Sequence, residues 1–154
     1  MTARRCLIPA AAVSAIALLS ACSSTPPPIA SKGTVTLYTG LLSGSSVAGA
    51  YPDVTAGSQV TITDASGTVI GTGTLSYDKT GEFELITLAA AKMGSNTGVT
   101  AAALSSDVAV YEFTATVPGG LSRYGISVGT GRGTIYENAA EMKDPALTLG
   151  SLSG

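Results

Sequence analysis

The chain has 154 residues, with eight basic and ten acidic side chains, two cysteines, no histidine and no tryptophan. Without histidine a Ser-His-Asp triad is excluded, and with so few cysteines the common zinc sites are excluded too. The scattered Lys and Arg argue against nucleic-acid binding, and abundant Gly, Ala, Thr, Ser and Val favour a sheet protein with many tight turns.

Residues 1–21 have the three-part layout of a secretory signal. Met1–Arg5 carries two positive charges, Leu7–Leu19 is apolar apart from Ser14, and small residues lead into Cys22. The apolar run has 13 residues, whereas a spanning helix needs about 20. We therefore expect a helical signal peptide that is removed, rather than a permanent transmembrane helix.

The end of this signal, Leu19, Ser20, Ala21 and Cys22, resembles the lipobox of bacterial lipoproteins, which reads Leu, a small residue, Gly or Ala, then Cys. The resemblance implies signal cleavage between Ala21 and Cys22. It also implies a diacylglycerol thioether on Cys22, with palmitate-like acyl chains that anchor the exported protein to the outer face of the cell membrane. The alternative is an ordinary secreted protein, but Leu19 stands where an Ala-x-Ala-like site has a small residue.

A tether is predicted at residues 22–32, because Ser and Pro dominate it and three prolines follow one another at 26–28. An extended segment of ten such residues would hold the domain roughly 30 Å from the lipid. Residues 33–154 then form one domain without any thiol or disulfide. Loss of Arg4 and Arg5 with the signal leaves the mature chain with a net negative charge.

Alternating apolar and polar residues, many of them β-branched, predict seven or eight short strands in this domain. Long Gly- and Ser-rich stretches at 40–57 and 94–98 predict loops, the first with a short edge strand at 46–48, and residues 99–104 fit either a strand or a short helix. Asn138 is placed to cap one helical turn at 139–143. The predicted strands are 33–39, 58–64, 68–77, 82–88, 107–117, 124–128, 134–137 and 146–149.

Two stretches carry a resemblance at the level of fold. Residues 59–75, a strand, an Asp-x-x-Gly turn and a strand, are similar to hairpins of immunoglobulin-like, transthyretin-like and collagen-adhesin B-type modules. Residues 113–128, with a Pro-Gly-Gly corner, resemble the last two core strands of such sandwiches. The resemblance implies an all-β, immunoglobulin-like β-sandwich. The whole chain also resembles small lipoproteins of high-GC Gram-positive bacteria.

Three patterns could carry chemistry, and each has a simpler structural interpretation. Ser76-x-x-Lys79 matches a Ser-Lys spacing but lies where a strand enters a turn. Glu82 and Glu84 could be a glycosidase pair, yet they fit the solvent face of a strand opposite Phe83. The loop Gly129–Gly133 could cradle phosphate, but it joins two strands and so predicts a hairpin turn.

No EF-hand-like spacing accompanies Asp53, Asp64 or Ser66, so we expect no metal site, and no motif predicts a cofactor. Tyr111 and Tyr124 are expected in the core, with hydroxyls that reach the backbone. The expected partner contacts are Tyr51, Arg132 and Tyr136.

The expected function is that of a non-enzymatic binding or structural module. It is anchored through Cys22 and contacts an unidentified envelope protein or wall polymer. The alternatives are a phage- or prophage-type interference lipoprotein at the membrane, a small-ligand carrier and a hydrolase.

Overall fold

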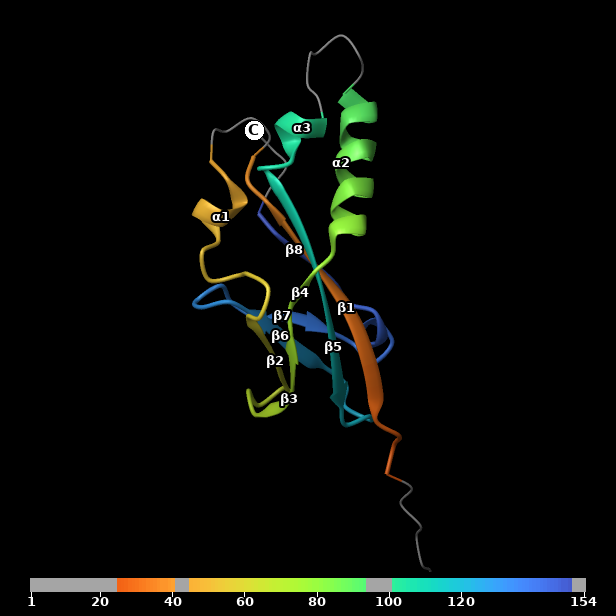
Figure 1. Cartoon of the computed structure of the whole chain (residues 1–154). Helices are drawn as coiled ribbons and strands as arrows, with labels where there is room; N and C mark the ends of the chain where they lie inside the picture. Colours follow the sequence, from red (N-terminus) through yellow and green to blue (C-terminus); the bar gives the residue numbers. More distant parts are fainter. Residues whose placement is uncertain (1–24, 41–44, 94–100, 151–154) are drawn as a thin grey trace, which may run out of the picture.

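Two four-stranded sheets enclose one hydrophobic core in this computed structural model, which describes residues 25–40, 45–93 and 101–150 (Figure 1). The first sheet has the order β4 (Ser76–Tyr77), β5 (Val108–Val117), β1 (Ile29–Tyr38) and β8 (Ala146–Leu149). The second has the order β3 (Val69–Thr74), β2 (Gln59–Thr63), β6 (Tyr124–Val128) and β7 (Ile135–Glu137). The predicted two-sheet β-sandwich architecture is confirmed, with helices added to it.

Alternation of side chains explains how the long strands β1 and β5 build the core. Val35 and Leu37 of β1 are fully buried, and Phe113 and Val117 of β5 are 1 % exposed. The two strands pair antiparallel along their whole length, from Ile29 opposite Val117 onward. Every second residue therefore faces the opposing sheet, as the period-two pattern predicted.

The first strand begins earlier than the sequence indicated. Residues 29–32, expected in the tether, form the first four positions of β1 and pair with β5. The prolines before them are also in contact with the domain, because a Cβ added at Gly119 would overlap the carbonyl oxygen of Pro27, and one at Gly120 would meet Pro26. The Pro-Gly-Gly corner thus contacts the prolines, and residues 29–32 belong to the sandwich rather than to the predicted 22–32 tether.

The hairpin β2–β3 forms as predicted, around a turn held by Asp64. Its Oδ1 accepts hydrogen bonds from the backbone amides of Ser66 at 2.8 Å and Thr68 at 2.9 Å. Gly67 completes the turn with φ +84°. On β3, an added Cβ at Gly71 would lie 2.7 Å from a methyl of Val117, so the absence of a side chain allows the close approach of β3 to β5 that the glycines predicted.

The predicted strand at 82–88 is wrong, because these residues lie in the helix α2 (Lys79–Met93). Asp78 precedes the helix, and its Oδ1 accepts the amide hydrogens of Thr80 at 3.1 Å and Gly81 at 3.0 Å. The apolar side chains that the helix turns inward recur at helical spacing, at positions 85, 86, 89, 90 and 93. They pack against Leu104 and the start of β5. This packing favours the helix over the strand that the seven-residue alternation predicted.

The remaining helical pieces are short. The predicted edge strand at 46–48 is instead the helix α1 (Val47–Ala50), whose N-cap Ser46 accepts the amide of Gly49 at 3.2 Å. Residues 101–104 form α3 (Ala101–Leu104). The predicted capped turn is confirmed as η2 (Glu141–Lys143), with Asn138 Oδ1 accepting the amide of Ala140 at 2.8 Å.

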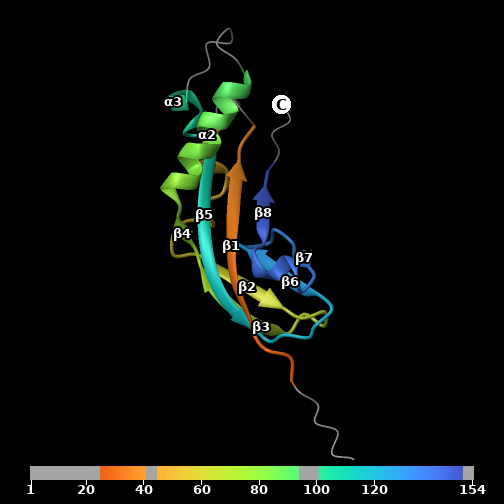
Figure 2. The same cartoon turned by 90° about the vertical axis from the view of Figure 1, so that its right-hand side faces the viewer.

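The two ends of the sandwich differ in character. The described chain enters at one end, beside the corner between β5 and β6, whereas α1, α2 and α3 gather at the other (Figures 1 and 2). Figure 2 shows α2 alongside the start of β5, with β1 and β8 next to it in the same sheet. The start of the described chain and the three helices therefore lie at opposite ends of the sandwich.

Candidate functional site

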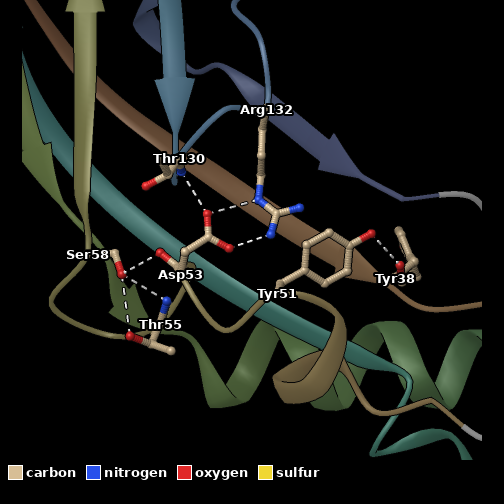
Figure 3. A network of polar contacts seen from close by, with 7 residues as sticks. All are labelled: Tyr38, Tyr51, Asp53, Thr55, Ser58, Thr130 and Arg132. Carbon is tan, nitrogen blue, oxygen red and sulfur yellow. Dashed lines mark hydrogen bonds and ion pairs between the residues drawn. The ribbon is translucent and has the colours of Figure 1, made fainter.

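An ion pair between Asp53 and Arg132 joins the segment after α1 to the β6–β7 hairpin (Figure 3). Arg132 Nη2 binds Asp53 Oδ1, and Arg132 Nε donates to Oδ2 at 3.2 Å. The amide of Thr130 donates to the same Oδ2 at 2.7 Å. The hydrogen bond from Arg132, followed by the bond from Thr130, holds the pKa of the Asp53 carboxyl well below its usual range. The same contact raises the pKa of Arg132.

The glycine-rich loop positions these donors. Gly129, Gly131 and Gly133 have φ values of +70°, +71° and +78°, a conformation that side chains disfavour. The loop joins β6 to β7, so the predicted hairpin turn is confirmed.

Tyr51 extends the network into the first sheet. Its ring lies under the guanidinium of Arg132, whose Cζ is 4.6 Å from the ring centroid. Its hydroxyl donates to the carbonyl oxygen of Tyr38 at 2.9 Å. Ser58 adds local order, since its hydroxyl donates to the Asp53 carbonyl oxygen at 3.2 Å. Figure 3 shows these side chains converging between the strands. The network therefore fixes residues 51–58 to both sheets.

The predicted partner residues are distributed over two places. Tyr51 and Arg132 contact each other, and about a quarter of the Arg132 side chain is exposed. Tyr136 on β7 is instead stacked under Arg123, with the guanidinium carbon 3.8 Å from its ring centroid, and it is 48 % exposed. Contact of any of the three with a partner remains a prediction.

A pocket of about 260 Å³ lies between α1, the start of α2 and β5. Tyr77 and Tyr111 meet on its wall edge to face, with ring centroids 5.8 Å apart. The Tyr77 hydroxyl donates to Glu82 Oε2 at 2.6 Å. Four hydroxyl side chains complete the polar lining, and apolar side chains such as Val54 and Val108 line the rest; the four are Ser46, Thr55, Ser105 and Ser106. We call this the tyrosine pocket.

The electrostatics of the tyrosine pocket follow from Glu82. The hydrogen bond between Glu82 and the Tyr77 hydroxyl is the main cause that raises the pKa of Tyr77 to about 12, and burial of the phenol is the second cause. Burial and then the same carboxylate raise the pKa of Tyr111. Both phenols therefore remain protonated well above neutral pH, and Glu82 is the sole charged residue among the described residues that line the pocket.

The sequence did not indicate this pocket, because it depends on the helix that was interpreted as a strand. In α2, Glu82 and Glu84 point in different directions instead of sharing one face, since residues two apart on a helix do not face each other. Phe83, expected inside, is 67 % exposed. Ser76, considered with Lys79, donates instead to the Glu112 carbonyl oxygen at 3.3 Å.

The two expected core tyrosines are both buried. Tyr124 is fully buried and its hydroxyl donates to the Pro118 carbonyl oxygen at 2.9 Å, which confirms the predicted backbone contact. Tyr111 is 9 % exposed and faces the tyrosine pocket.

In the described ranges 25–40, 45–93 and 101–150, no three His, Cys, Asp or Glu side chains gather into a group that could hold a metal ion. Of the helices in these ranges, none is both long enough and apolar enough to cross a membrane. The lipobox residues Leu19, Ser20, Ala21 and Cys22, and the predicted loop at 94–98, lie outside the described residues.

Comparison of the chain with protein families, with curated proteins and with solved structures finds no match.

Proposed function

We propose that this chain is a lipid-anchored envelope protein whose sandwich is a non-enzymatic binding module. The four residues ending at Cys22, after a basic start and an apolar run, support the anchor. The lack of histidine, and of any thiol after Cys22, supports a binding role over the commonest hydrolytic chemistries.

The observation that carries the proposal is the separation between chain entry and pocket. β1 begins at Ile29, at the end of the sandwich opposite the helices (Figure 1). Seven residue steps separate Ile29 from Cys22, so this end stays within about 25 Å of an acylated Cys22. An anchor at Cys22 thereby presents the helical end and the tyrosine pocket away from the lipid.

We also propose an immunoglobulin-like grouping for the sandwich. In immunoglobulin domains a corner tyrosine bonds to the backbone a few residues upstream, and Tyr124 makes such a bond to Pro118. The grouping rests on this corner and on the two-sheet architecture. The insertion of α2 between β4 and β5 is a departure from the seven-stranded constant-type domain.

The anchor is tested by expressing the full chain in a bacterial host and separating membrane from soluble fractions. We expect the wild-type chain in the membrane fraction, with an N-terminal peptide that begins at Cys22 and carries the mass of acyl chains. The matched Cys22→Ser chain should lose both properties. If Cys22→Ser is still processed and membrane-bound, the anchor proposal is refuted.

A further inference from the structure

Three hydroxyls of the tyrosine pocket already donate their hydrogen within the protein, so they offer only acceptors to a ligand. The Tyr77 hydroxyl uses its hydrogen on Glu82, and the Ser105 hydroxyl uses its own on the Ala102 carbonyl oxygen at 2.8 Å. Ser106 points its hydroxyl hydrogen toward Asp107, at 3.4 Å. Each hydroxyl oxygen keeps lone pairs, and Glu82 keeps Oε1. A ligand that satisfies these groups must donate hydrogen bonds.

The charge and the aromatic rings of the pocket select the kind of donor. Glu82 supplies a negative charge, and no basic side chain stands beside it among the described lining residues. Anionic ligands are therefore repelled. The faces of Tyr77 and Tyr111 attract cations through their quadrupoles. Tyr77 is 48 % exposed, so its ring is accessible from solvent.

The size of the pocket limits the ligand. A volume of about 260 Å³ lies below the range of about 300–1,000 Å³ that holds drug-sized molecules. Val54 and Val108 provide apolar surface next to the polar wall. This combination fits a short alkyl stem that ends in a charged donor.

We propose that the tyrosine pocket binds a primary alkylammonium group, either a small free amine or a lysine side chain of a partner. The ammonium group bonds to Glu82 and the hydroxyl oxygens, and its stem packs on the tyrosine rings and valines. This inference rests on the proposed binding function and gives it a ligand class. The Asp53–Arg132 network supports the site, because it fixes the segment that carries Val54.

The test is a titration of the full-length purified chain, followed by NMR of ¹³C-labelled tyrosine. The lysine probe is Nα-acetyl-lysine N-methylamide and the free-amine probe is butylammonium. Nα-acetyl-norleucine N-methylamide is the uncharged control. We expect saturable shifts of the Tyr77 and Tyr111 signals with either amine at millimolar concentration, and none with norleucine. Stronger binding of the lysine probe assigns the ligand to a partner's side chain, and stronger binding of butylammonium assigns it to a free amine.

Matched variants locate the charge. Glu82→Gln should weaken binding by about tenfold or more, through loss of a charge-assisted hydrogen bond. Glu84→Gln removes the same charge two positions away and should change the Kd less than about twofold. Tyr77→Phe keeps the ring and the Glu82 carboxylate but removes one hydroxyl acceptor, so it should weaken binding less than Glu82→Gln does. Thermal melting of each variant verifies that it is folded.

Three results would overturn the proposal. The first is no tyrosine shift with either amine up to about 20 mM, well above a millimolar Kd. The second is equal binding of the norleucine probe. The third is an equal loss in Glu84→Gln and Glu82→Gln. Lipidation is measured separately, by membrane fractionation. A membrane-bound chain that does not bind amines refutes only the proposed ligand. A soluble chain that binds amines refutes only the proposed anchor.

Discussion

Substitution of Gly73 by alanine tests why the two sheets can approach so closely. The added Cβ would stand 2.8 Å from the carbonyl oxygen of Thr114 and 3.1 Å from Cδ2 of Phe113, whereas carbon–oxygen contacts between strands lie near 3.3–3.6 Å. Neither neighbour yields easily, because one is strand backbone and Phe113 is 1 % exposed. Overpacking costs about 1–3 kcal/mol, and the smaller entropy of the unfolded chain returns about 0.4–1 kcal/mol.

We therefore expect Gly73→Ala to lower the free energy of unfolding by about 1–2 kcal/mol, and the melting temperature by roughly 3–10 °C. The assay is urea unfolding followed by tyrosine fluorescence, with thermal melting by circular dichroism. Gly49→Ala is the control: the nearest atom would be Ser46 Oγ at 3.4 Å, and the site is exposed in α1. It should be neutral or stabilising. A Gly73→Ala protein as stable as wild type would refute the close-approach argument.

Three further predictions concern the polar contacts and the corner. Tyr124→Phe should cost about 1 kcal/mol in urea unfolding, since one hydrogen bond to the exposed Pro118 is lost; a loss above about 3 kcal/mol would contradict a single-bond role. Asp53→Asn should lower the melting temperature most at neutral pH. The bond to Arg132 depresses the folded-state pKa of Asp53 below its unfolded value, so its contribution is full above about pH 4 and disappears as the pH falls through the folded value; a difference from wild type that is unchanged between pH 7 and pH 2 would refute this. Gly119→Ala should displace the proline segment, seen as narrowing of its proline ¹³C signals toward those of mobile chain, and unchanged line widths would show that the contact is absent in solution.

The sheet framework was predictable because its strands carry strong local signals. β5 shows a long apolar alternation, and the β2–β3 hairpin has a turn that Asp64 and Gly67 specify within four residues. Such features depend on neighbours in sequence. The pairing of β1 with β8 depends on a contact between the two ends of the domain, and no local pattern encodes it.

The site could be predicted only in part. Residues 82–88 fit two periods at once, and the helical one is chosen by packing against β5 and by the Asp78 cap. With α2 assigned as a strand, Glu82 could not be brought to Tyr77. Tyr51 and Arg132 were singled out by type, but their contact through Asp53 spans two sheets and needs the folded chain.

The position of β1 has a consequence for the order in which the chain folds. Its two neighbours are β5 and β8, and β8 is the last strand of the described chain. Long-range pairing of this kind is slow, because the loop must close before its contacts form. The strand nearest the proposed anchor therefore completes its hydrogen bonds only after the C-terminal segment has emerged. A chain truncated before β8 therefore leaves this edge of β1 unpaired and exposed to aggregation.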